Sequence, residues 1–323
     1  MRAATSLCRR SRFTPLFRGS AHKSRMAAIG SSSTWPRIST RSSTSDGRIG
    51  GLVRLTHPFP SLLDGAVVGA VALTAGADPI TAARLALSMV VLQASIGALN
   101  DLVDAPRDAG HKPSKPIPAG VVTPAATTAV VLLGGGLGVL LAMPSGSSLV
   151  IVALAGLSIG YGYDLRFKGT AWSWLPFAVG IPLLPVYGWL GATGVLPPFF
   201  AILVPMTVLA GSALAIANAS ADMERDRAAG TDSVAIRLGR DRSWALNVSL
   251  LGIVMVVAVG SLIIAETPEA ALVGALAGFA LVALGLALGR RGSDRRPDIA
   301  WEIQAVGLGV VAAAWIAGVA VAA

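Results

Sequence analysis

The chain has 323 residues, of which 54% are hydrophobic and only 13% are charged. Soluble domains carry about 25% charged residues, so the composition excludes an ordinary soluble protein and indicates an integral membrane protein. The net charge of +9 comes entirely from residues 1–48, because the rest of the chain holds equal numbers of basic and acidic residues. The folded body therefore gives no sign of a nucleic-acid partner. The whole chain has a single cysteine, Cys8, which excludes an intrachain disulfide.

Residues 1–48 are rich in arginine and serine and have no apolar periodicity, which predicts a disordered extension. They lack an apolar core of the length that signal peptides have. Two origins stay open, namely an organelle transit peptide, whose composition the segment resembles, or upstream sequence read from a mis-assigned start ahead of Met26. The sequence thus predicts this extension and a transmembrane domain at residues 49–323.

Nine apolar segments of membrane-spanning length follow the extension and predict an all-α integral membrane protein, a nine-transmembrane-helix bundle. With the N-terminus in the cytosol, every basic residue after residue 48 except Arg84 falls on the cytosolic side, as the positive-inside rule requires. The predicted location is therefore the cell membrane, in a multi-pass arrangement. The predicted spans are residues 59–76, 80–100, 124–143, 147–163, 172–193, 199–221, 243–265, 268–289 and 301–321.

The fifth span holds three prolines, Pro176, Pro182 and Pro185. Proline removes a backbone hydrogen bond from a helix. Neighbouring membrane helices can satisfy the freed carbonyl groups, so this span is predicted to be kinked rather than absent.

The polar residues that close the second span are the central feature of the sequence. Asn100, Asp104 and Asp108 are four residues apart, so in a continuous helix they would share one face. Pro106 is expected to end the helix near Asp104, which places Asp108 on the following loop. Carboxylates at the end of a membrane-length helix are costly and rarely lack a function.

A second copy of this pattern closes the sixth span, at a constant offset of 118 residues. Such an offset predicts a pseudo-repeat of helices 1–4 and 5–8. Both motif helices run in the same direction, so both motifs are expected to face one cytosolic cavity. Two carboxylate sets at one cavity suit Mg²⁺, which prefers oxygen ligands and often bridges to substrate phosphates. The matched residues are Asn100 with Asn218, Asp104 with Asp222, Arg107 with Arg225, and Asp108 with Asp226.

Together with nine helices, these motifs resemble the UbiA-type intramembrane prenyltransferases. The likeness covers roughly residues 50–320 and rests on Asn-Asp-x-x-Asp-x-x-x-Asp after the second helix and Asp-x-x-x-Asp after the sixth. Residues 115–120 read Lys-Pro-Ile-Pro-Ala-Gly and are similar to that family's Arg-Pro-Ile-Pro-Ser-Gly segment. Gly230-Thr231 and Arg237-Leu238-Gly239, after the second motif, also fit the family pattern.

The resemblance implies an enzyme that uses Mg²⁺ to transfer a polyprenyl group from an isoprenyl diphosphate to a small aromatic acceptor, either 4-hydroxybenzoate-like or a quinone precursor. Metal and cationic side chains would neutralise the leaving diphosphate, and the bundle and bilayer would take the isoprenoid chain. By likeness, the metal ligands are Asn100, Asp104, Asp108, Asp222 and Asp226, of which Asp104 and Asp222 are also catalytic, with Asp101 and Asn218 in supporting roles. The residues expected to contact the diphosphate are Arg107, Lys112, Lys115, Arg166, Lys168 and Arg225.

Tyr163 is the third predicted catalytic residue. Ionisation of the allylic carbon–oxygen bond leaves a carbocation, and aromatic faces attract cations. Members of the family often carry Tyr-x-x-x-Lys after the fourth helix, whereas Lys168 here lies one residue later. This departure leaves Arg166 as an alternative to Lys168 at the diphosphate.

Three alternatives stay open at the level of the sequence. A membrane terpene cyclase, or a transferase with a phosphoribosyl or glycerol-phosphate acceptor, would share the fold and the metal–diphosphate chemistry. An ion-coupled transporter is the third, but its ion site would lie near the bilayer midplane. The acidic residues here lie at helix ends beside basic connections, which argues against the transporter.

Overall fold

The structure, a computed structural model, describes residues 45–291 and 298–322. Every regular element within these two ranges is a helix, so the predicted all-α class is confirmed. The disorder predicted for residues 1–44 lies outside the described residues. Helix α2 (Ser45–Leu55) begins at Ser45, within the last residues of the extension predicted for residues 1–48, and the division into an extension and a transmembrane domain stays a prediction.

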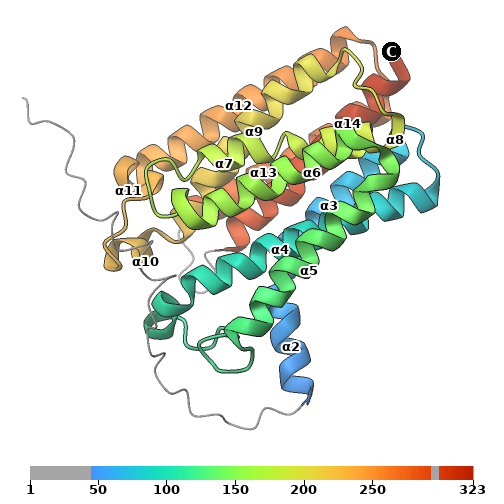
Figure 1. The fold of residues 1–323 in the computed structure, drawn as a ribbon. Coiled ribbons are helices and arrows are strands. Elements are labelled where there is room, and N and C mark those ends of the chain that lie inside the picture. The colour runs from blue at the N-terminus through green and yellow to red at the C-terminus, as the bar shows by residue number, and fades with distance from the viewer. Residues whose placement is uncertain (1–44, 292–297, 323) are drawn as a thin grey trace, which may run out of the picture. The chain divides into compact units, whose positions relative to one another are not determined.

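Eight helical stretches of the described chain are long and apolar enough to cross a membrane, and the shorter apolar helix α3 adds a ninth (Figure 1). This count agrees with the nine spans predicted. The spans are α3 (Pro58–Thr74), α4 (Pro79–His111), α5 (Pro124–Ala142) with η1 (Met143–Ser145), α6 (Ser147–Gly162) with η2 (Tyr163–Phe167), α7 (Leu175–Gly180) with α8 (Leu183–Thr193), α9 (Phe200–Ala221), α12 (Arg240–Ile264), α13 (Glu269–Arg291) and α14 (Ile299–Ala322). Two short helices, α10 (Met223–Ala228) and α11 (Val234–Leu238), follow α9.

Local sequence signals explain where several helices start and break. Asp78 caps α4, because its side chain accepts hydrogen bonds from the backbone N–H groups of Ile80 at 2.9 Å and Thr81 at 3.1 Å. The predicted kink in the fifth span is a break, since α7 ends and α8 begins on either side of Ile181 and Pro182.

Pro106 does not end α4, contrary to the expectation from the sequence. The helix continues for more than one turn beyond it. Ala105 is buried in this region and belongs to a small apolar cluster with Leu55 of α2 and Ile117 of the following loop. Burial of these side chains offsets the one backbone hydrogen bond that Pro106 removes. Asp108 therefore lies on α4 and not on a loop.

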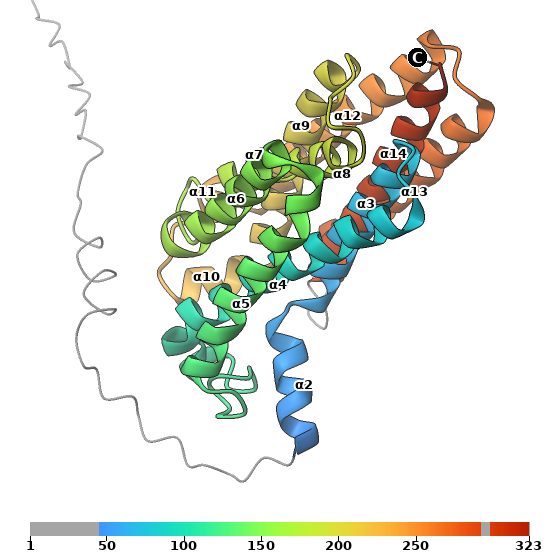
Figure 2. The same cartoon turned by 45° about the vertical axis from the view of Figure 1, so that its right-hand side comes forward.

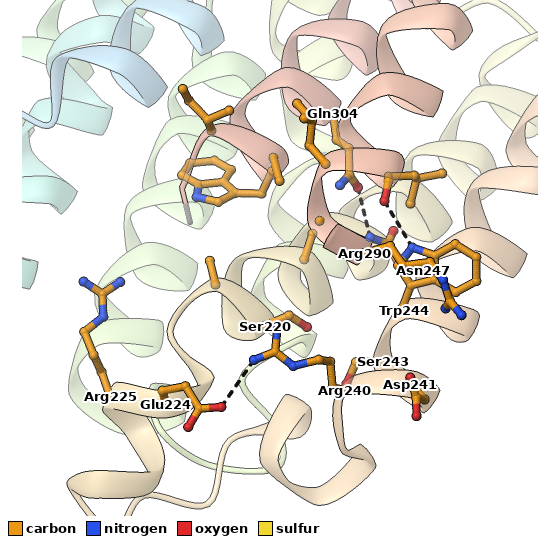
Figure 3. Close-up of a pocket in the computed structure, with 18 residues that line it drawn as sticks. Ser220, Glu224, Arg225, Arg240, Asp241, Ser243, Trp244, Asn247, Arg290 and Gln304 are labelled. Atoms are coloured by element: carbon orange, nitrogen blue, oxygen red, sulfur yellow. Dashed lines mark hydrogen bonds and ion pairs between the residues drawn. The ribbon is translucent and has the colours of Figure 1, made fainter. Parts of the chain in front are cut away.

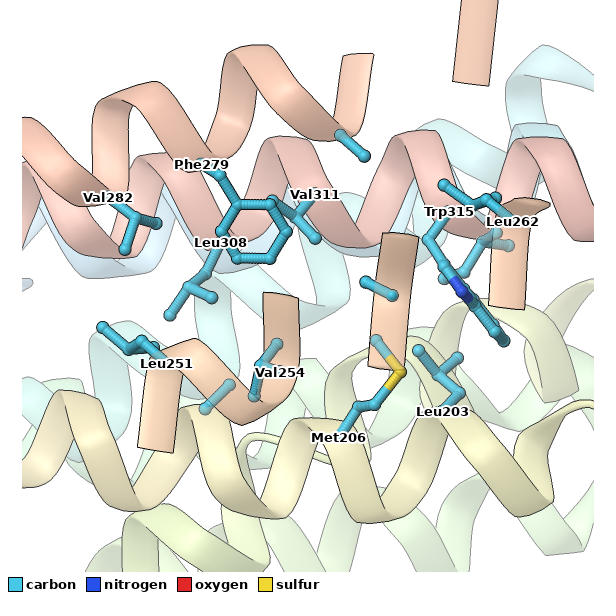
Figure 4. Packing of buried hydrophobic residues seen from close by; sticks show 14 of the residues in the cluster. Leu203, Met206, Leu251, Val254, Leu262, Phe279, Val282, Leu308, Val311 and Trp315 are labelled. Atoms are coloured by element: carbon cyan, nitrogen blue, oxygen red, sulfur yellow. The ribbon is translucent and has the colours of Figure 1, made fainter. Parts of the chain in front are cut away.

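The main apolar core lies among α9, α12, α13 and α14, and Figure 4 shows Trp315 of α14 beside Leu262 of α12 and near Leu203 of α9. Small residues allow close packing in this region. A Cβ atom added to Gly278 of α13 would lie only 2.7 Å from the carbonyl oxygen of Gly307 on α14. Close backbone contact of this kind is typical of helices that pack in lipid.

The fold brings the two motif regions to one end of the bundle. Figures 1 and 2 both show the C-terminal end of α4 near the short helix α10, which follows the sixth span. The expectation that both motifs lie on the same side is met in the structure.

Candidate active site

The first motif presents its polar side chains on two adjoining faces of α4. An α-helix turns by about 100° per residue. Asn100, Asp104 and Arg107 therefore share one face, and Asp101 and Asp108 share the next. The prediction that Asp108 shares the face of Asn100 and Asp104 is wrong, because eight residues of a continuous helix turn it by about 80°. The first face, with Asn100, Asp104 and Arg107, contacts the end of the fourth span and the second motif. The second face, with Asp108, contacts the loop after α4.

Lys168 reaches the first face because the turn before it is a π-helix. In η2 the backbone N–H of Lys168 donates to the carbonyl oxygen of Tyr163 at 2.8 Å. A bond that spans five residues takes up the extra residue between Tyr163 and Lys168. Lys168 then forms an ion pair with Asp104, whereas the side chain of Arg166 is exposed. Of the two candidate cations, the structure brings Lys168 to the motif.

Asp164 is a residue of the site that the sequence analysis missed. Its Oδ1 accepts a hydrogen bond from Nδ2 of Asn100 at 2.7 Å, and the residue is only 2% exposed. Its Oδ2 is buried without a hydrogen-bond partner among the described residues. Because Asp164 holds the amide nitrogen of Asn100, the side-chain atom of Asn100 that can bind a cation is its carbonyl oxygen. A carboxylate directly after Tyr163, at the end of an apolar run, was the available sequence signal.

The second motif lies against the first. The guanidinium of Arg107 approaches Asp226 at 3.6 Å, so one ion pair joins the two motifs. Asp222 pairs with Arg225, which also approaches Asp298 at 3.7 Å. Each of these carboxylates is thus held by a basic side chain.

Asn218 lies on α9, one turn before Asp222, and is half-buried. Its supporting role stays a prediction.

The second face of α4 is held by Lys115 and His57. The Lys115 ammonium lies 2.7 Å from Asp101 and 2.8 Å from Asp108. Burial alone would lower the pKa of Lys115, but its bonds to these two carboxylates outweigh burial and raise it. His57, in the left-handed backbone conformation ahead of α3, lies 3.1 Å from Asp101 through Nε2. The metal-binding role of Asp108 stays a prediction, and it would require Asp108 to leave Lys115.

Lys112 lies among other basic residues of the site. Burial lowers its pKa, and the positive charges of Arg225 and Lys115 lower it further, against a partial compensation from Asp108. Among the described residues it forms no ion pair with a carboxylate. A bound anion between the two motifs would relieve the repulsion between these cations.

An apolar cavity of about 240 Å³ opens next to the first motif, among α3, α4, α6, α7 and α8. Asn100, Asp164 and Tyr163 line it, and the Tyr163 ring packs edge-on against Phe177 with the ring centroids 5.5 Å apart. An aromatic ring therefore lies between the polar motif and the apolar chamber.

The sequence analysis also missed three polar residues that line this cavity. Asp64 could have been found as the only acid inside the first apolar span, since an ionisable residue in a membrane helix is a default functional candidate. The others are Gln93 and His57.

A second cavity, of about 680 Å³, lies among α9, α10, α12, α13 and α14 (Figure 3). Arg225 lines it, so this cavity adjoins the second motif. At its rim Arg240 lies 3.3 Å from Glu224, and deeper in the bundle Nδ2 of Asn247 donates to Gln304 at 2.9 Å. This cavity is more polar and more basic than the one beside α4.

The residues present fit a magnesium ion that binds together with a diphosphate. No group of three or more His, Cys, Asp and Glu side chains within residues 45–291 and 298–322 lies close enough to hold a metal alone. Asp104, Asp222 and Asp226 are each paired with a cation instead. Mg²⁺ usually takes one or two carboxylates and completes its shell with water and substrate phosphates, and the oxygen donors of the two motifs suit it.

Known proteins share both the sequence pattern and the fold. The sequence pattern of the UbiA prenyltransferase family matches residues 63–321. The chain is 31% identical over 241 residues to chlorophyll synthase, chloroplastic, from Arabidopsis thaliana. The aligned region covers 68% of this chain and 62% of the plant protein. It is 27% identical over 196 residues to digeranylgeranylglyceryl phosphate synthase from Methanoregula boonei, which covers 58% of this chain and 68% of that protein. The chain thus spans less than two thirds of the length of the plant relative.

The fold is similar to that of a UbiA homologue from Archaeoglobus fulgidus whose structure was solved bound to DMAPP and Mg²⁺. The TM-score is 0.64 at 19% sequence identity, and the likeness covers 80% of this chain and 98% of that one. The family pattern extends over well more than half of the chain and includes both motifs and most residues of the cavity beside them. The chain belongs to the UbiA prenyltransferase family.

Proposed function

We propose that this protein transfers a polyprenyl group from an isoprenyl diphosphate to a small aromatic acceptor, with Mg²⁺ as the cofactor. The observation that carries the proposal is the junction of the two carboxylate motifs through Arg107 and Asp226, next to an apolar cavity. One end of this arrangement suits a metal–diphosphate group, and the other suits an isoprenoid chain.

The donor would bind by exchanging the partners of existing ion pairs. Asn100, Asp104, Asp222 and Asp226 would hold the metal, which supplies positive charge to the leaving diphosphate. Lys168 and Arg107, then released from their carboxylates, would contact phosphate oxygens, and Lys112 would gain a counter-ion. Lys115, which stays with Asp101 and Asp108, would hold the second face of α4 in place.

The chemical step would break the allylic carbon–oxygen bond, and its electron pair would leave with the diphosphate. The resulting cation lies beside the Tyr163 ring, where the apolar lining of the cavity excludes water and the aromatic face favours positive charge. A nucleophilic atom of the acceptor would then give its electron pair to the allylic carbon, and the acceptor would lose a proton to the released diphosphate.

The names of the curated relatives point to acceptors other than a small aromatic ring, so the acceptor is the part of the proposal that the experiment must resolve. A cyclase with this fold would form its product without any acceptor. We place the site on the cytosolic side of the cell membrane, because the connections at the motif end carry nearly all the basic residues of the body.

The test uses the full chain purified in detergent, with geranyl diphosphate as donor. Diphosphate release should vanish in EDTA and return with Mg²⁺, and a prenylated product should form only when an aromatic acceptor is present. Activity that is unchanged in chelator would contradict the metal role. An isoprenoid product that forms without any acceptor would favour the cyclase.

A further inference from the structure

Asp64 and Gln93 form a polar pair inside the transmembrane cavity that the chemistry of the diphosphate does not use. Nε2 of Gln93, on α4, donates to Oδ2 of Asp64, on α3, at 2.5 Å. Both side chains line the cavity of about 240 Å³. A carboxyl group within a membrane helix is costly, and one hydrogen bond from a neutral amide compensates only part of that cost. The pair therefore has capacity for a further hydrogen-bond partner.

The close approach of α3 and α4 brings the two residues together. A Cβ atom at Gly65, the neighbour of Asp64, would lie 2.4 Å from Cγ2 of Val90 and 2.9 Å from the carbonyl oxygen of Ala86. Only a glycine permits this separation of the helices. The polar pair is thus fixed by backbone packing and not only by its own hydrogen bond.

The pair lies at a depth that suits an acceptor molecule. Gln93 precedes Asn100 by seven residues, which is two helical turns or about 10 Å along the axis of α4. Asn100, Tyr163 and the pair all line the same cavity. A ring whose reacting atom lies near the diphosphate end can therefore reach the pair with a substituent on its far side.

The charge of the cavity lining restricts what that substituent can be. No lysine or arginine is found among the described residues that line the cavity, whereas Asp64 and Asp164 both contribute carboxyl groups. A carboxylate substituent next to Asp64 would place a second carboxyl group where no lysine or arginine compensates its charge, and His57 of the lining is already bound to Asp101. A hydroxyl group can donate to Asp64 and accept from the amide of Gln93, so it satisfies both members of the pair.

We infer that Asp64 and Gln93 are specificity-determining residues that select an uncharged acceptor with a hydroxyl group, which donates its hydrogen to Asp64. The inference rests on the proposed function and narrows its acceptor class to neutral phenols and hydroquinones. Within that function it disfavours acceptors such as 4-hydroxybenzoate, whose carboxylate would have to lie in this cavity.

The experiment measures prenyl transfer from geranyl diphosphate by the full chain to three probes: hydroquinone, its dimethyl ether and 4-hydroxybenzoate. The wild type should prefer hydroquinone, and the dimethyl ether, which has no hydroxyl hydrogen to donate, should neither react nor compete. A lost hydrogen bond corresponds to about a twofold to tenfold effect. Asp64→Asn should therefore raise the KM for hydroquinone by that factor and leave the KM for the donor unchanged.

Gln93→Leu should also raise the KM for hydroquinone and leave the KM for the donor unchanged. Gln304→Leu is its matched control. Gln304 also forms a buried amide hydrogen bond between helices, but it lines the other cavity. Thermal stability of each variant is measured alongside, and because Asp64→Asn keeps the size of the side chain and an oxygen that accepts from Gln93, it should fold.

Each outcome bears on one proposal or the other. A higher kcat/KM for 4-hydroxybenzoate than for hydroquinone, or unchanged selectivity in Asp64→Asn, would overturn the inference. Metal-dependent turnover of the donor with transfer to none of the probes would overturn the inference and leave the proposed function standing. Failure of the wild type to bind or turn over any isoprenyl diphosphate would overturn the proposed function itself.

Discussion

Asp104 and Asp222 come from different motifs, yet each makes the same kind of contact, an ion pair with a basic residue. Their partners, Lys168 and Arg225, are candidates to bind the diphosphate. If both carboxylates act on one metal–diphosphate group, the loss of either one removes the neutralising assembly.

We therefore expect Asp104→Asn and Asp222→Asn each to lower turnover by orders of magnitude, and the double variant to be little worse than either single variant. Residues that act as a unit show such non-additive losses. Steady-state turnover of the wild type, both single variants and the double variant tests this. If the two carboxylates were solvated helix ends without function, each substitution would change the free energy of unfolding by only about 0.5 kcal/mol and leave turnover near that of the wild type. If they belonged to independent sites, the turnover losses of the two single variants would multiply in the double variant.

Lys112 gives the site an expected pH dependence. Its pKa lies below the ordinary lysine value, because it is buried and faces other cations. Its charged form, which we propose binds the diphosphate, is fully present below that pKa and is lost as the pH rises through it. The donor KM should thus be flat near neutral pH and rise at alkaline pH.

Lys112→Arg provides the control, because arginine keeps its charge throughout this range. The alkaline rise of the donor KM should disappear in this variant. A rise of the same size in Lys112→Arg would assign the pH dependence to another group.

The sequence predicted the motif residues but not the polar residues around them. Asn100 and Asp104 were accessible because their spacing and their place at the end of an apolar run can be read directly. Asp164 and Gln93 acquire their roles only through partners 64 and 29 residues away in the chain. No short-range sequence pattern indicates which distant side chains will form such hydrogen bonds.

Among the secondary-structure elements, the π-helical turn η2 decides where Lys168 lies. It accommodates the one-residue departure from Tyr-x-x-x-Lys noted in the sequence. Deletion of Leu165, which is 47% exposed, should convert this turn to an α-helical one and keep Lys168 near Asp104. We expect this variant to keep donor turnover within about tenfold of the wild type, because a π turn differs from an α turn by one residue.

Deletion of Leu154 is the matched comparison. This leucine is 49% exposed but lies within the regular part of α6, so its removal rotates the following residues by about 100°. Turnover should then be lost. Equal losses in the two deletion variants would show that the π turn is not what accommodates the extra residue.

The sequence predicts the membrane-spanning helices better than it predicts where they end. Pro106 predicted a helix end that does not occur, because contacts with α2 and the following loop stabilise the last turns of α4. Local propensity is a weak prior that tertiary packing overrides. The nine spans were predictable, since a run of apolar residues of membrane length needs no tertiary information.

For the whole molecule, the described residues 45–291 and 298–322 contain every residue assigned to the site, whereas the excess positive charge belongs to residues 1–48. Removal of residues 1–44 should therefore leave donor turnover in detergent within about twofold of the full chain. The measurement compares the two proteins at equal amounts of folded, membrane-inserted material. A truncated protein that inserts normally but has no activity would contradict the predicted domain organisation.

Gly65 has a consequence for how the substrate range of this protein can change over time. It does not line the cavity, yet it sets the separation of the two helices that carry Asp64 and Gln93. A larger residue at this position would push the helices apart and uncouple the two side chains without altering any group that lines the proposed acceptor site. Drift toward new acceptors can therefore begin at a position that a survey of substrate contacts would overlook, and libraries built to retarget the protein should include Gly65.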